Sequence, residues 1–82
     1  MKSGRYFVLL NENDNVVTIL DENIDVNFLR NGMKIFEQIP FGHKVSITKI
    51  EIGEDIIKYG IKIGTAQKNI EKGYHVHIHN CE

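Results

Sequence analysis

The stretch YFVLLNENDNVVTIL, residues 6–20, decides the fold of this chain of 82 residues. Two runs rich in β-branched, aromatic and aliphatic residues, Tyr6–Leu10 and Val16–Leu20, are typical of strands. The five residues between them, 11–15, are only Asn, Asp and Glu. Asn and Asp accept left-handed backbone conformations and hydrogen-bond to their own backbone. The stretch therefore predicts a β-hairpin at the start of the chain.

A seven-residue pattern then occurs three times: an apolar residue, two further residues, a glycine, two variable residues and an apolar residue. The copies are residues 29–35, 50–56 and 70–76. Their glycines, Gly32, Gly53 and Gly73, lie 21 and then 20 residues apart. Each copy predicts a tight turn with positive φ at glycine, followed by a strand whose third residue points inward. Three such units predict strands that fold back regularly into a compact, barrel-like β arrangement.

The remaining strand signals are short. Val45–Ile52 alternates strictly between the two faces of a predicted strand. Shorter strands are predicted at Ile56–Tyr59 and Ile61–Gly64, and a last one at Tyr74–Asn80. No window carries a clean apolar stripe of helical period, so at most a short helical turn is expected, within Asn23–Arg30. The predicted fold class is all-β.

Composition limits the functions that the chain could perform. Ten Lys plus Arg nearly balance eleven Asp plus Glu, so neither nucleic acid nor an anionic membrane is expected as a partner. No apolar stretch approaches membrane-spanning length, and Tyr6–Leu10 is too short for a signal peptide. The only cysteine, Cys81, cannot form an internal disulfide, which favours a reducing, cytoplasmic location.

The length predicts one domain, residues 1–82 with a core at about 6–80. A chain of this size buries about 60–65% of its unfolded surface, so its core is thin. Little protein remains with which to build a deep, water-excluding active site. The size therefore favours an accessory or binding module that forms one part of a larger enzyme.

Three of the four histidines, His75, His77 and His79, lie in the last predicted strand. Alternate residues of a strand share a face, so these three imidazoles are predicted to lie on one side. The opposite, core-facing side is predicted to hold Tyr74, Val76 and Ile78.

Histidines on one strand face support several kinds of chemistry. Neighbours on such a face stand about 6.5–7 Å apart, so two imidazoles can converge on one metal ion at about 2.0–2.1 Å each. Acid/base groups and hydrogen bonds to a sugar acid remain open alternatives, as does a polar face without any ligand. A metal site would need a third ligand. Cys81 lies on the same odd-numbered face, and another subunit could also supply it.

Two further segments carry candidate binding residues. In IPFGHK, residues 39–44, Pro40 and Gly42 predict a rigid corner from which His43 and Lys44 emerge, either as an anion-facing pair or as two solvated cations. In KYGIKIG, residues 58–64, the two glycines predict a bend with close backbone approach. That segment lacks the Gly-Lys-Ser/Thr ending of a phosphate-binding loop.

Three motifs, in their order along the chain, resemble those of the N-terminal module of the altronate and galactarate dehydratase family. The motifs are Ile39–Lys44, Ile57–Gly64 and Gly73–Asn80, and the resemblance runs from about residue 8 to residue 81. That module is of the SAF type, similar to antifreeze-like domains, and has a β-clip fold. The family removes water from sugar acids with a divalent metal, and relatives remove sulfite from sulfolactate. In some members the module is a separate small subunit, the form that this chain resembles.

The resemblance implies roles for individual residues. The implied catalytic residues are His77, His79 and Asn80, and the implied substrate-binding residues are His43, Lys44, Lys58 and Tyr59. His77 and His79 are also the implied metal ligands. The implied metal is Fe²⁺, with Mn²⁺ or Mg²⁺ as alternatives, held mainly by a large catalytic partner subunit. The alternative reading is a stand-alone SAF module that binds a metabolite or a protein without catalysis.

Overall fold

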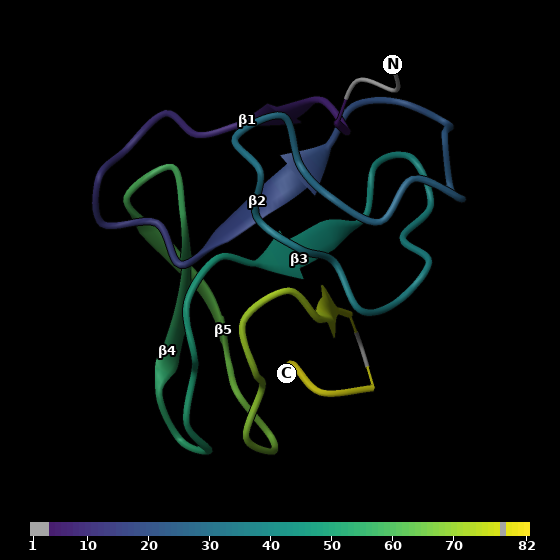
Figure 1. Ribbon diagram of the computed structural model, residues 1–82. Coiled ribbons are helices and arrows are strands. Elements are labelled where there is room, and N and C mark those ends of the chain that lie inside the picture. Colours follow the sequence, from purple (N-terminus) through teal and green to yellow (C-terminus); the bar gives the residue numbers. More distant parts are fainter. Residues whose placement is uncertain (1–3, 78) are drawn as a thin grey trace.

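A computed structural model describes residues 4–77 and 79–82 and is all-β (Figure 1). Its strands are β1 (Phe7–Val8), β2 (Val16–Ile19), β3 (Lys44–Ser46), β4 (Asp55–Lys58), β5 (Ile61–Thr65) and β6 (His75–Val76). The predicted all-β class is therefore confirmed. The expected helical turn within Asn23–Arg30 is absent from the described residues, where that segment contains a simple turn at residues 24–25. Within the described part of the chain, no helix is long and apolar enough to cross a membrane.

The strands form two antiparallel sheets. The larger has the order β1-β2-β3-β6, and the smaller is the hairpin of β4 and β5. β1 and β2 pair with Phe7 opposite Ile19, which confirms the predicted opening hairpin. β3 pairs with β6, so that Lys44 lies opposite Val76. Figure 1 shows the β4–β5 hairpin below β2 and β3.

The three glycine units form the predicted turns, but only two of them lead into a strand among the described residues. Gly53 precedes β4 and Gly73 precedes β6, whereas Gly32 is followed by an isolated bridge at Lys34. Gly32, Gly53 and Gly73 have φ of 89°, 86° and 89°, the left-handed region that glycine adopts without steric cost. The first and last residues of every unit are buried: Leu29 and Ile35, Ile50 and Ile56, Ile70 and Val76. Each unit therefore anchors both ends of its turn in apolar packing.

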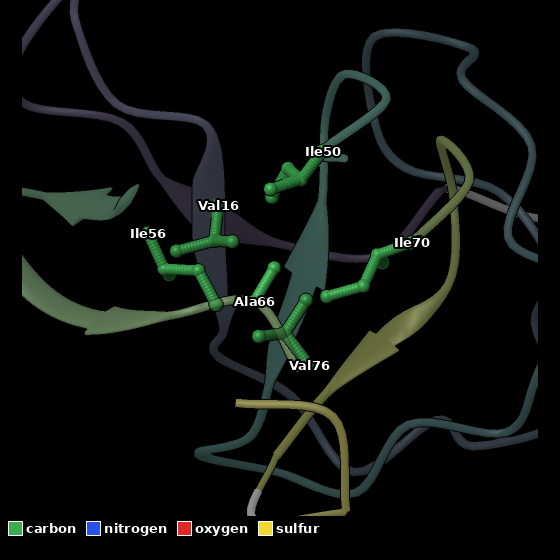
Figure 2. Close-up of a cluster of buried hydrophobic side chains, with 6 residues drawn as sticks. All are labelled: Val16, Ile50, Ile56, Ala66, Ile70 and Val76. Atoms are coloured by element: carbon green, nitrogen blue, oxygen red, sulfur yellow. The ribbon is translucent and has the colours of Figure 1, made fainter. Parts of the chain in front are cut away.

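Two apolar clusters cover the two faces of β2. Val16 belongs to the first cluster, which Figure 2 shows converging with Ile50, Ile56, Ala66, Ile70 and Val76. Val17 belongs to the second, with Ile19, Leu29, Ile35, Ile39 and Val45. Successive residues of a strand point to opposite faces, so β2 is buried on both sides. The thin domain thus divides its core into two layers separated by one sheet.

The two longest predicted strands are much shorter in the structure. The alternation of Val45–Ile52 predicted one long strand, but β3 ends at Ser46. Ser46 is buried, and its hydroxyl donates a hydrogen bond of 2.6 Å to the carbonyl of Glu71. The chain then bends, and Ile50 pairs separately with Ile70. The alternating pattern reflects two separate buried contacts rather than one strand.

The predicted last strand, Tyr74–Asn80, is also too long, because β6 covers only His75–Val76. Val76 is buried as expected, whereas Tyr74 is exposed and stacks on Phe36 with ring centroids 5.4 Å apart. The placement of Tyr74 on the core face is therefore wrong. Ile78, predicted on the same face, lies outside the described residues.

A buried arginine, which the sequence analysis did not single out, connects its own segment to the segments that carry Asp21 and Ile39. Arg5 is only 1% exposed. Its Nε donates to Asp21 Oδ1 at 2.8 Å and its Nη2 to the Asp21 carbonyl at 2.8 Å, while Nη1 donates to the Ile39 carbonyl. A buried guanidinium is tolerated only when its donors are satisfied in this way.

This ion pair predicts a particular dependence of stability on pH. Burial raises the pKa of the Asp21 carboxyl, but hydrogen bonds from the Tyr6 N–H, the Arg5 guanidinium and the Asn23 N–H outweigh burial and hold it below 3.8. A carboxyl with a lowered pKa stabilises the fold above the unfolded-state pKa, and that stability is lost as pH falls through the folded-state pKa.

We therefore expect Asp21→Asn to lower the free energy of unfolding by about 1–3 kcal/mol at pH 7, with a smaller deficit at pH 3. Urea unfolding of both proteins at the two pH values measures this difference. An equal deficit at both pH values would show that the charge of Asp21 contributes nothing.

Candidate functional site

The four histidines form one cluster, but the last three do not share one face of a continuous strand as predicted. Pairing of β3 with β6 places Val45 opposite His75 and brings His43, just before β3, against it. The His43 and His75 ring centroids lie 5.0 Å apart. His77 stacks on His43 at 4.6 Å with an interplanar angle of 14°. His75 also contacts His79 at 5.4 Å, so His75 lies at the centre of the cluster.

A turn, not a continuous strand face, arranges the last three histidines. β6 ends at Val76, and Asn80 closes the turn that follows. The backbone N–H of His77 donates to Asn80 Oδ1 at 3.0 Å, and Asn80 Nδ2 donates to the backbone carbonyl of His75 at 2.7 Å. Asn80 is buried, and its amide shapes the backbone that carries the histidines. Its direct contact with substrate stays a prediction.

The central pair of histidines shares a hydrogen bond. His43 Nδ1 and His75 Nε2 are 2.9 Å apart, so one ring donates and the other accepts. Burial lowers the pKa of His75 below its ordinary 6.5, and the neighbouring His43, His79 and His77 lower it further, while Glu37 opposes them more weakly. His75 is therefore neutral at pH 7. A neutral imidazole linked to a second one can accept or pass on a proton.

A pocket of about 410 Å³ opens beside this cluster. It is lined by Lys44, Lys58, Tyr59, Ile63, Val76, His77 and Cys81. Among these described residues there are two lysines and no carboxylate, so the lining carries a net positive charge. The tyrosine hydroxyl and the imidazole add hydrogen-bonding groups. The pocket is therefore suited to an anion.

The structure thus unites residues that the sequence places far apart. Lys44, Lys58, Tyr59 and His77 line the same pocket, and His43 stacks behind His77. His79 and Asn80 instead line a second pocket of about 270 Å³, with Glu37, Lys68, Asn69, Ile70, Glu71 and Tyr74. The two predicted catalytic histidines therefore face different pockets, connected through His75.

The sequence did not single out Glu37, and it suggested Cys81 only as a possible third metal ligand. Glu37 Oε1 accepts a hydrogen bond of 2.9 Å from the backbone N–H of His75, although the two residues are 38 positions apart in the chain. Cys81 contributes to the basic pocket. Burial raises the pKa of its thiol, against the opposing effect of Lys44, so the thiol is protonated at neutral pH and is a poor nucleophile.

The described residues do not by themselves form a metal site. Among residues 4–77 and 79–82, no three His, Cys, Asp or Glu side chains are arranged to hold a metal ion. The rings of His43 and His77 are stacked almost in parallel. Lone pairs on imidazole nitrogens lie in the plane of the ring, so stacked rings do not converge on one ion. The described residues therefore do not fit the implied divalent metal without further ligands.

Fold and site together define a small β-clip domain with a positively charged pocket beside a histidine cluster. The chain belongs to the family described as altronate/galactarate dehydratase SAF domain, which it matches over residues 5–82. It is 30% identical to the (2R)-sulfolactate sulfo-lyase subunit alpha of Chromohalobacter salexigens, over 93% of this chain and 92% of that protein.

Other relatives are much longer than this chain. It is 30% identical to altronate dehydratase of Bacillus subtilis over 93% of this chain, and 34% identical to altronate dehydratase of Escherichia coli over 90%. In both comparisons the match covers 16% of the longer protein. The predicted family is thereby confirmed, and the domain occurs among relatives of two different sizes.

Proposed function

We propose that this chain is the small subunit of a lyase that acts on a hydroxy acid, either a sugar acid such as altronate or galactarate or the related sulfolactate. The observation that carries the proposal is the basic pocket, in which Lys44, Lys58, Tyr59 and His77 meet without a carboxylate. All these substrates carry a carboxylate, and sulfolactate also carries a sulfonate. The lysines supply the charge that holds such groups in place.

The histidine cluster supplies the proton chemistry in this proposal. Elimination from a hydroxy acid requires a base for the proton beside the carboxylate and an acid that assists the leaving group. His77 lines the pocket and is stacked on His43, which shares a hydrogen bond with His75. A proton taken up at one imidazole is therefore adjacent to further imidazoles. His79 serves the same reaction from the second pocket.

A large partner subunit completes the site in this proposal. The similar sulfo-lyase protein is named a subunit, and the similar altronate dehydratases extend far beyond the matched segment. Two of the residues that line the pocket, Tyr59 and Ile63, are large and each 44% exposed, and Ile61 beside them in β5 is 66% exposed. Exposed apolar side chains gathered at a polar site are typical of a protein interface. Any divalent metal, with Fe²⁺ preferred over Mn²⁺ and Mg²⁺, is assigned to that partner.

The test is partner dependence of activity. The chain is purified from its native lysate together with any stoichiometric large protein, and both are assayed apart and together. The substrates are altronate, galactarate and sulfolactate, with added Fe²⁺ or Mn²⁺. We expect elimination only when both chains are present. A folded, monomeric chain without a partner and without turnover would instead support a stand-alone binding module.

A further inference from the structure

The tip of the β4–β5 hairpin holds a tyrosine in an unfavourable backbone conformation. Tyr59 has φ of +56° and is the only non-glycine residue with positive φ in the described part of the chain. With Gly60 at +73° it forms a two-residue turn between Lys58 and Ile61. Positive φ at both central positions is the mark of a type I′ turn, which favours Asn, Asp or Gly at the first of them. An aromatic residue there is costly.

The loop between β1 and β2 clamps this turn. Asp14 is only 6% exposed, and its Oδ1 accepts the Gly60 N–H at 2.7 Å. Asn15 Oδ1 accepts the Ile57 N–H at 2.8 Å, so the same loop also holds β4. Asn11 packs so closely on the turn that a Cβ at Gly60 would lie 2.6 Å from its Nδ2. The loop thus fixes the hairpin tip through side chains 46 residues distant in sequence.

The side chains that the tip presents are those of the basic pocket. Lys58 Nζ lies 3.4 Å from the centroid of the Tyr59 ring, a cation–π contact, and both residues line the pocket. The turn itself would form more easily with Asn in place of Tyr59. A costly conformation that persists beside a binding pocket points to a use for the side chain.

We propose that Asp14 is a positioning residue for the anion site. By holding the Gly60 N–H it maintains the left-handed conformation of Tyr59 and so directs Tyr59 and Lys58 into the pocket. This inference rests on the proposed function, because it requires the pocket to bind an anion. Buried Asp14 acts through the turn and does not itself contact the ligand.

The experiment measures binding of tartrate, a hydroxy diacid, to the full chain by calorimetry or NMR titration, together with urea unfolding. We expect Asp14→Ala to raise the Kd at least tenfold, measured where the variant remains folded. Asp14→Asn keeps an acceptor oxygen and should stay within about threefold of the parent. That partial rescue distinguishes positioning from bulk destabilisation.

Tyr59→Asn provides the second arm, which does not depend on whether Asp14→Ala folds. It should raise the urea midpoint, since Asn-Gly suits the type I′ turn, and still raise the Kd at least tenfold. An Asp14→Ala or Tyr59→Asn variant that binds tartrate as tightly as the parent would overturn the positioning role while leaving the proposed function standing. A parent chain that binds no tartrate would overturn the anion site of the isolated chain and with it the positioning role, whereas the proposed function is tested separately by partner-dependent elimination.

Discussion

Val76→Asp is expected to abolish folding of the domain. Val76 is 2% exposed and packs in the first apolar cluster at the point where β6 meets β3 (Figure 2). A carboxylate there would lie beside Lys44 at the edge of the basic pocket. It would nevertheless replace a buried apolar side chain of the cluster, and removing a charge from water at such a position costs several kcal/mol. The whole stability of a domain of this size is about 4–12 kcal/mol. Far-ultraviolet circular dichroism and dispersion of amide signals in NMR spectra measure the loss.

The matched control is Ile61→Asp, which introduces the same side chain at an exposed position of β5. Its free energy of unfolding should stay within about 0.5 kcal/mol of the parent. A soluble, folded Val76→Asp protein would show that β6 presents its other face to the core.

Replacement of His77 and His79 together by alanine is expected to reduce turnover of the reconstituted two-subunit enzyme by about 10²–10⁴-fold, the usual contribution of a positioned acid or base. Both side chains are exposed, so truncating them removes little core packing and the isolated chain should remain folded. Steady-state assays at saturating small subunit, combined with urea unfolding of the variant, separate the two effects.

An exposed pair that lines neither pocket, Lys49→Ala with Glu51→Ala, serves as the control and should leave turnover unchanged. If the histidine variant instead lost its fold, and its folded fraction kept full specific activity, His77 and His79 would be structural residues. The double variant tests the proposed proton chemistry of His77 and His79, whereas replacing Lys44 alone would test only anion binding.

The parts of the fold that were predictable from the sequence depend on local chemistry. The Asn- and Asp-rich loop specified the first hairpin, and Gly32, Gly53 and Gly73 specified three turns with their inward-facing third residues. Strand lengths were not predictable. At the end of β3 the Ser46 side chain bonds to the distant Glu71 carbonyl, and after β6 the Asn80 side chain bonds to the backbone of His77 and His75. An alternating pattern does not show where such bonds form.

Several residues of the candidate pocket were named from the sequence, but their arrangement was not. The resemblance pointed to Lys44, Lys58, Tyr59 and His77, and these line one pocket. The central position of His75 was missed, because it arises from pairing with the segment that carries His43. The buried Arg5 was also missed, since its partners lie on segments whose approach no local pattern reveals.

The order in which loops close during folding follows from the pairing of β3 with β6. β4 and β5 are joined by two residues, and such a hairpin forms within microseconds. The contact between His43 and His75 spans 32 residues, and the entropy of closing that loop is lost before its contacts are gained. The histidine cluster therefore exists only once this long-range pairing is complete. A chain that has formed only its local hairpins has not yet assembled the proposed site.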